Sequence, residues 1–109
     1  MHESTIQVKI QLDEQKIPQS IDWSATDSTA QEAQAARAMM LTFWDPTDKT
    51  ALRIDLWTKD MMVDEMKKFY HQNIMTLTDT YLRATGDSAT ADQVKNMFSK
   101  IGKDIGILK

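Results

Sequence analysis

The side chains that could catalyse a reaction or bind a metal ion are those of two histidines and several aspartates. His71 could serve as a general base or a zinc ligand, the two common roles of imidazole. It has no second histidine at helical spacing and no partner evident in the sequence, and H-E-x-x-H does not occur. We therefore expect His71 on the surface of a helix and His2 in a flexible end.

The aspartates could suggest a calcium or magnesium site. The loop after Asp45 lacks the ligand spacing and the glycine of an EF-hand. Turn formation and helix capping already explain most of these carboxylates, and Asp55 can pair locally with Arg53. We thus expect no metal, no cofactor and no catalytic residue. The residues considered are Asp45, Asp48, Asp55, Asp60 and Asp64.

Other reaction types lack their motifs as well. The three glycines all follow residue 85 and cannot form a phosphate-binding loop, and there is no G-x-S-x-G turn. A net charge of −3 argues against nucleic acid as a main partner. The chain has no cysteine, no signal-peptide pattern and no apolar run of membrane-spanning length. These features predict a cytoplasmic protein without direct membrane insertion that is not an enzyme, folded as one domain over residues 1–109.

Alternating apolar residues predict two β-hairpins. In the first, strands over 6–12 and 17–23 pair with Leu12 opposite Ile17, and Pro18 places the second strand at an edge. In the second, strands over 39–44 and 50–57 flank an Asp45-Pro46 turn, with Phe43 opposite Leu52. This register gathers six apolar side chains on one predicted core face.

Helical patterns predict the remaining elements. A short alanine-rich helix over 30–38 can be capped by Ser28. A long helix starts near 60–62, with Asp60 as a plausible N-cap, and ends at Gly86. Asp87 and Ser88 can cap a last helix. The expected fold is α+β: two β-hairpins form an antiparallel sheet packed on one face by helices, in the order ββαββαα, as a two-layer sandwich. The buried stripe of the long helix is predicted to consist of Val63, Met66, Tyr70, Ile74, Leu77 and Tyr81.

The face opposite the predicted core carries the candidate interaction surface. Tryptophan is enriched at binding hot spots, and methionine can line adaptable contacts. The alternative is that these side chains are covered by the chain's own helix or loops. The surface consists of Met40, Trp44, Arg53, Asp55 and Trp57, with Met61 and Met62 at the strand–helix corner.

Three segments resemble the gliding motility-associated GldC family: Leu52 to Met61, Val63 to Lys67, and Arg83 to Asp87. The chain is also similar in size and in its N-terminal hairpin. The resemblance implies a bacterial accessory protein of gliding motility without catalytic activity. No catalytic or ligand residue is carried over from it.

Three functions follow as hypotheses, the last of which is a small enzyme; it would need a pocket in which His71 meets a carboxylate from another element, which the predicted helix phase does not favour. The first is a non-enzymatic module that binds a protein partner of the motility apparatus or associates with itself. The alternative is a small-ligand or lipid-binding domain with a cavity between sheet and helices.

Overall fold

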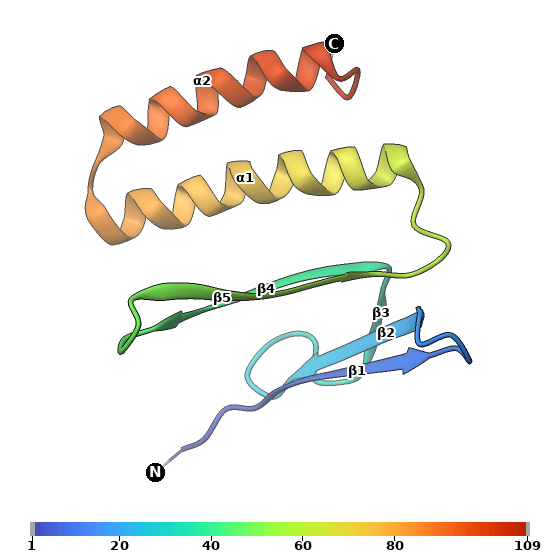
Figure 1. Cartoon of the computed structure of the whole chain (residues 1–109). Helices are drawn as coiled ribbons and strands as arrows, with labels where there is room; N and C mark the ends of the chain where they lie inside the picture. Colours follow the sequence, from blue (N-terminus) through green and yellow to red (C-terminus); the bar gives the residue numbers. More distant parts are fainter. Residues whose placement is uncertain (1, 109) are drawn as a thin grey trace. The chain divides into compact units, whose positions relative to one another are not determined.

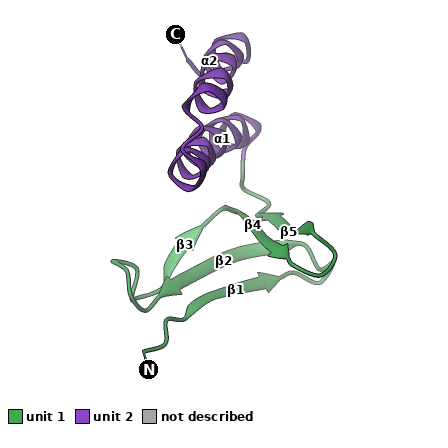
Figure 2. Cartoon of the chain, turned by 90° about the vertical axis from the view of Figure 1, so that its left-hand side faces the viewer, with its two compact units in different colours: residues 1–61 green, residues 62–109 purple. Residues whose placement is uncertain are grey.

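A computed structural model describes residues 2–108 and shows an α+β chain in the order βββββαα (Figure 1). It divides into two compact units, residues 1–61 with the strands and residues 62–109 with the helices (Figure 2). The elements are β1 (Ile6–Leu12), β2 (Pro18–Ala25), β3 (Gln34–Ala36), β4 (Ala38–Asp45), β5 (Thr50–Trp57), α1 (Val63–Thr85) and α2 (Ser88–Asp104). The predicted packing of helices on the sheet stays a prediction.

The alanine-rich segment forms a strand, so the predicted short helix is wrong. β3 extends an antiparallel sheet in the order β1-β2-β3, with Ala36 paired to Ile21. The Ser28 hydroxyl donates to the Ala25 carbonyl at 3.1 Å and accepts from the Ala30 amide at 2.9 Å, which closes a turn. Starting a helix fixes several residues for one hydrogen bond. Without large apolar side chains to bury, this segment instead pairs with a strand that already exists.

The first hairpin forms, but its register differs by two residues from the prediction. Val8 pairs with Trp23 and Ile10 with Ile21. The turn holds one residue more than predicted, at the point where Lys16 adopts φ 63°. A second extra residue lies where the register shifts next to Pro18. Two shifts of one residue keep the same side chains on the same face. β2 is the central strand and not an edge; Pro18 is tolerated because it begins the strand at this irregularity.

The second hairpin confirms the predicted register throughout. β4 and β5 form a separate two-stranded sheet in which Phe43 faces Leu52 and Leu41 faces Ile54. The Asp45 carbonyl accepts the Lys49 amide at 2.8 Å, and the Asp45 carboxylate accepts the Thr47 amide at 3.2 Å. These bonds hold the four-residue turn and set the pairing of the strands that follow.

The predicted core face of this hairpin is open. Phe43, Leu52 and Ile54 are 59%, 56% and 50% exposed. A two-stranded ribbon is only about 5 Å between strand axes, so its side chains have water on both flanks. In the first hairpin Ile6 and Leu12 are also exposed, whereas Ile21 on the central strand is buried.

The long helix has the predicted length and begins where predicted, near residues 60–62, but its N-cap is not Asp60. Its N-cap is Met62, whose amide donates to the Glu65 carboxylate at 3.3 Å. Asp60 therefore does not cap it. Gly86 ends the helix as predicted, with φ 72° and its amide donating to the Leu82 carbonyl at 2.8 Å. Asp87 caps α2 by accepting the Thr90 amide at 3.1 Å.

The contact between α1 and α2 overturns the surface position predicted for His71. This side chain is 6% exposed, and its Nε2 lies 2.7 Å from the Phe98 carbonyl oxygen. A Cβ on Gly102 would lie 2.8 Å from that same nitrogen, so glycine permits this approach. The residues buried in α1 are His71 and Thr78. Of the predicted stripe, Met66 and Ile74 are half-buried, whereas Val63, Tyr70, Leu77 and Tyr81 are exposed.

Candidate interaction surface

The β4–β5 register places five predicted surface residues on one face. Strand side chains alternate between faces, so Met40 and Trp44 of β4 point the same way. Their cross-strand neighbours are Asp55 and Ala51, which share that face with Arg53 and Trp57. The sequence thus predicted correctly which side chains lie together. Their role in binding stays a prediction.

A charged pair occupies the middle of this face. The Arg53 guanidinium donates to both Asp55 carboxylate oxygens, at 2.9 and 3.1 Å, and to the Thr42 hydroxyl at 2.6 Å. The hydrogen bonds that the guanidinium donates to Asp55 raise the pKa of Arg53 above its usual value. A guanidinium held in two directions loses little further freedom when a third group binds it. The pair therefore presents a fixed charge pattern to the solvent.

The two tryptophans lie at opposite ends of the face. Trp44 is 66% exposed and pairs with Ala51, whereas Trp57 is 56% exposed and pairs with Ala38. Six residues along a strand separate the two rows, which corresponds to about 20 Å. Within one chain the tryptophans therefore form two anchors with the Arg53–Asp55 pair between them.

The two methionines of the predicted corner differ in exposure. Met61 is half-buried in the loop after β5, where its amide donates to the Thr58 carbonyl at 3.1 Å. Met62 begins the helical unit and is 64% exposed. Met61 thus belongs to the strand unit and Met62 to the helical unit.

The histidine and aspartates show structural roles. His71 faces a backbone carbonyl between two helices. Asp45 holds a turn, Asp55 pairs with Arg53, and Asp64 lies in the first turn of α1. Within residues 2–108, no three acidic or histidine side chains are placed to hold a metal ion.

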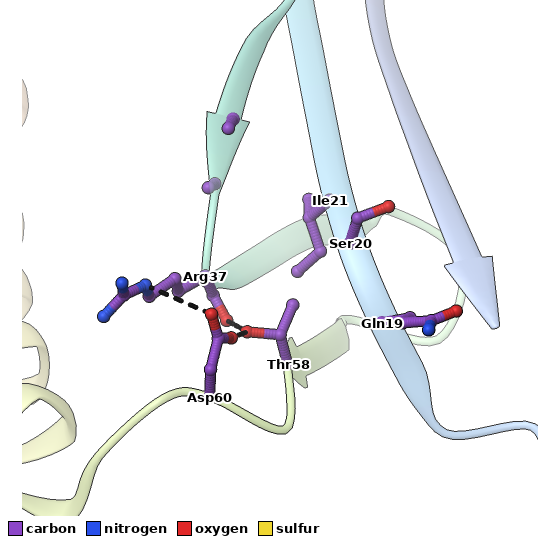
Figure 3. A pocket seen from close by; sticks show the side chains of 8 residues that line it. Gln19, Ser20, Ile21, Arg37, Thr58 and Asp60 are labelled. Carbon is purple, nitrogen blue, oxygen red and sulfur yellow. Dashed lines mark hydrogen bonds and ion pairs between the residues drawn. The ribbon is translucent and has the colours of Figure 1, made fainter. Parts of the chain in front are cut away.

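Sequence reasoning missed a polar pocket of about 290 Å³ where β3 leaves β2 (Figure 3). The Thr58 hydroxyl bonds the Asp60 carboxylate, and this bond lowers the pKa of Asp60. Arg37 Nε lies 3.6 Å from the other Asp60 oxygen. The one sequence feature that could have indicated this pocket is Arg37, the single arginine near the end of the alanine-rich segment.

The pockets described within each unit are small and open to solvent. Besides the polar pocket, one of about 280 Å³ lies between α1 and α2 and one of about 240 Å³ lies beside β5. Sites for drug-sized ligands usually measure about 300–1,000 Å³. The expected ligand cavity between sheet and helices stays a prediction. Among residues 2–108, neither helix combines the length and apolar character needed to cross a membrane.

The chain is a small α+β protein whose β4–β5 hairpin exposes large aromatic and apolar side chains. Residues 18–107 match the family model described as gliding motility-associated protein GldC-like. The chain therefore belongs to the GldC-like family, as the resemblance implied. The comparisons with curated proteins and with solved structures found no match.

Proposed function

We propose that this chain is a non-enzymatic accessory module of gliding motility that acts by binding another protein through the β4–β5 hairpin. Membership in the GldC-like family supports the link to motility, and its description names no reaction. The observation that carries the binding role is the pair of exposed tryptophans, Trp44 and Trp57, on one ordered strand face.

The chemistry of this face suits a protein partner. Tryptophan combines a large apolar area with few rotatable bonds, so it loses little entropy on binding. The Arg53–Asp55 pair has no net charge, and the guanidinium is already oriented by Thr42. A partner would cover the aromatic rings at both ends of the face and meet a preorganised polar pair between them.

Affinity capture of the tagged chain from its native cells tests the proposal. We expect one protein to be recovered in stoichiometric amount with the unmodified chain and lost with Trp44→Ala combined with Trp57→Ala. Cell spreading should fall in the same variant. Phe43→Ala is the matched control, because Phe43 is 59% exposed on the opposite face of the same hairpin. Unchanged capture and spreading in a folded double variant would refute this surface.

A further inference from the structure

β5 is an edge strand of the second sheet. Within residues 2–108 this sheet has two strands, so no further strand is hydrogen-bonded to β5 on the side away from β4. Isolated two-stranded hairpins are marginally stable in water. Exposed edges are usually protected by charged side chains, above all lysine, by proline or by a bulge. β5, with the sequence Thr-Ala-Leu-Arg-Ile-Asp-Leu-Trp, has no lysine or proline, and its register with β4 runs without a shift. Its two charged residues, Arg53 and Asp55, are of opposite sign and already form a pair.

The direction of the backbone groups at this edge follows from one bond. The Thr58 amide donates to the Arg37 carbonyl at 2.8 Å, which continues the β4–β5 ladder. Amides alternate in direction along a strand, so those of Ile54 and Leu56 also face β4. The amides and carbonyls of Arg53 and Asp55 therefore face outward, together with those of their neighbours at positions 51 and 57.

We infer that two copies of this chain associate through antiparallel β5–β5 pairing, with a two-fold axis at Ile54. This register places Arg53 opposite Asp55 of the second copy, twice by symmetry. Both residues have outward backbone groups, so the two copies can exchange backbone hydrogen bonds at these positions. The result is a continuous four-stranded sheet in the order β4-β5-β5-β4.

Charge selects this register over its neighbours. Moving the axis to position 53 would place two arginines opposite each other, and moving it to position 55 would do the same with two aspartates. Like charges in direct cross-strand pairs are unfavourable. Shifts of one residue would set the charged face of one copy against the apolar face of the other. β1 is also an edge strand, but Lys9 is its one charged residue and offers no such complement.

Side-chain size agrees with the same register. Ala51 of one copy stands opposite Trp57 of the second, and Trp44 lies on the other side of Ala51. A small residue between two tryptophans leaves room for both rings. Anchors that lie about 20 Å apart in one chain thus come within two strand spacings, or about 10 Å, of each other across the pair. On the opposite face Ile54 meets its own copy, and Leu52 meets Leu56.

A space at the end of β5 is compatible with an incoming strand. The pocket of about 240 Å³ is lined by Asp55, Leu56 and Trp57 on one side and by Ile17 and Pro18 on the other. Consecutive strand residues point to opposite faces, so a pocket that three of them share lies at the strand edge. Pro18 lacks an amide hydrogen and cannot donate to this edge itself. Residues 51–53 of the second copy would enter here.

Cysteine cross-linking tests the register directly, because the chain contains no cysteine. Ile54→Cys places two thiols opposite each other in a pair without mutual backbone bonds, where Cα atoms are about 4.5 Å apart and a disulfide can form. We expect covalent dimers under mild oxidation. Leu52→Cys is the matched control on the same face, 56% exposed against 50% for Ile54. Its own copy would lie four residues along, about 13 Å away, and should not cross-link. Equal cross-linking of both variants overturns the register.

A charge swap tests the contact between copies apart from the pair within each chain. Arg53→Asp alone or Asp55→Arg alone gives two like charges on each strand, and sedimentation should show at least a tenfold weaker dimer. Mixing the two variants should restore a heterodimer, because positions 53 and 55 are then complementary only between chains. A monomeric unmodified chain, or two variants that dimerise normally, overturns the inference. It stands apart from the proposed function: loss of partner capture with an intact dimer affects only the latter.

Discussion

The α1–α2 pair and the β4–β5 hairpin use their residues in opposite ways. In the helical pair, His71 bonds a backbone carbonyl, Phe98 packs beside it, and Gly102 leaves the space that His71 and Leu108 occupy. In the hairpin, order comes from cross-strand pairs, while large apolar and aromatic side chains remain exposed on both faces. Exposure alone does not separate the two regions, because Val63, Leu77 and Tyr81 are also exposed on the helical pair. The hairpin differs in presenting two exposed tryptophans on one ordered strand face.

The largest effect on stability is expected at the helix contact. Gly102→Val would add atoms where a Cβ alone lies 2.5 Å from Leu108 and 2.8 Å from His71. Overpacking of this kind costs about 1–3 kcal/mol, and urea unfolding of the full chain should show a loss of about 2 kcal/mol. Ser99→Val, at an exposed position of the same helix, is the control and should change stability far less. A neutral Gly102→Val would mean that the helices do not approach as closely as described.

The helix N-terminus offers a gain of intermediate size. Met62 occupies the N-cap of α1 and provides no side-chain cap bond. Met62→Ser supplies a hydroxyl that can accept an amide of the first turn, and should raise the unfolding free energy by about 1 kcal/mol. Met62→Ala is the control, because alanine is a poor N-cap. If serine and alanine behave alike in thermal unfolding, the helix does not begin where Met62 places it.

The pH dependence of the helical unit should depend partly on Asp87. Hydrogen bonds from Thr90, and then from Tyr81, lower the pKa of this carboxyl. A lowered folded-state pKa means that the stabilisation is complete above the unfolded value of about 3.9 and disappears as pH falls through the folded value. Asp87→Asn keeps a good cap without this titration. Its acid unfolding curve should therefore fall less steeply below about pH 4; identical slopes would exclude a contribution from Asp87.

The two hairpins show how far sequence could predict the fold. The second was predicted in full because Asp45 and Pro46 specify the turn, and the apolar pairs then follow by counting. In the first, the left-handed Lys16 and the shift beside Pro18 each moved the register by one, and neither leaves a signal in the hydrophobic pattern. Alanine propensity also favoured a helix where β2 already offered a pairing edge. In the first hairpin and in the alanine-rich segment, pairing with another strand decided the structure against the local sequence preference.

The candidate site, like the fold, could be predicted only in part. Shared faces follow from alternation, so the grouping of Trp44, Arg53, Asp55 and Trp57 could be predicted. Exposure could not be predicted in this way: Phe43, Leu52 and Ile54 of the predicted core face are exposed, and His71 is buried where it meets the Phe98 carbonyl of α2. The self-complementary order of charges in β5 is visible in the sequence. This order points to pairing between two copies only once β5 is known to be an edge strand.

The smallest effect on stability is expected from Trp57→Ala, and this variant tests the comparison most directly. Trp57 is 56% exposed at the end of β5, so its removal should change the unfolding free energy by about 0.5 kcal/mol or less. Removal of an aromatic hot-spot residue typically costs a complex about 2 kcal/mol or more, which corresponds to roughly thirtyfold in affinity. We therefore expect partner capture to be lost from a chain that unfolds normally, as measured by urea titration beside the capture experiment.

Gly102→Val should behave in the reverse way, with reduced stability and retained capture at temperatures where the chain is folded. If Trp57→Ala instead destabilises the chain as much as Gly102→Val does, then Trp57 belongs to the internal packing. The hairpin face would then be covered by the chain itself, and the contrast between the two regions would no longer hold. If both variants behave as expected, Gly102 serves the packing of the helical pair, and Trp57 lies on a hairpin face that is available to a partner.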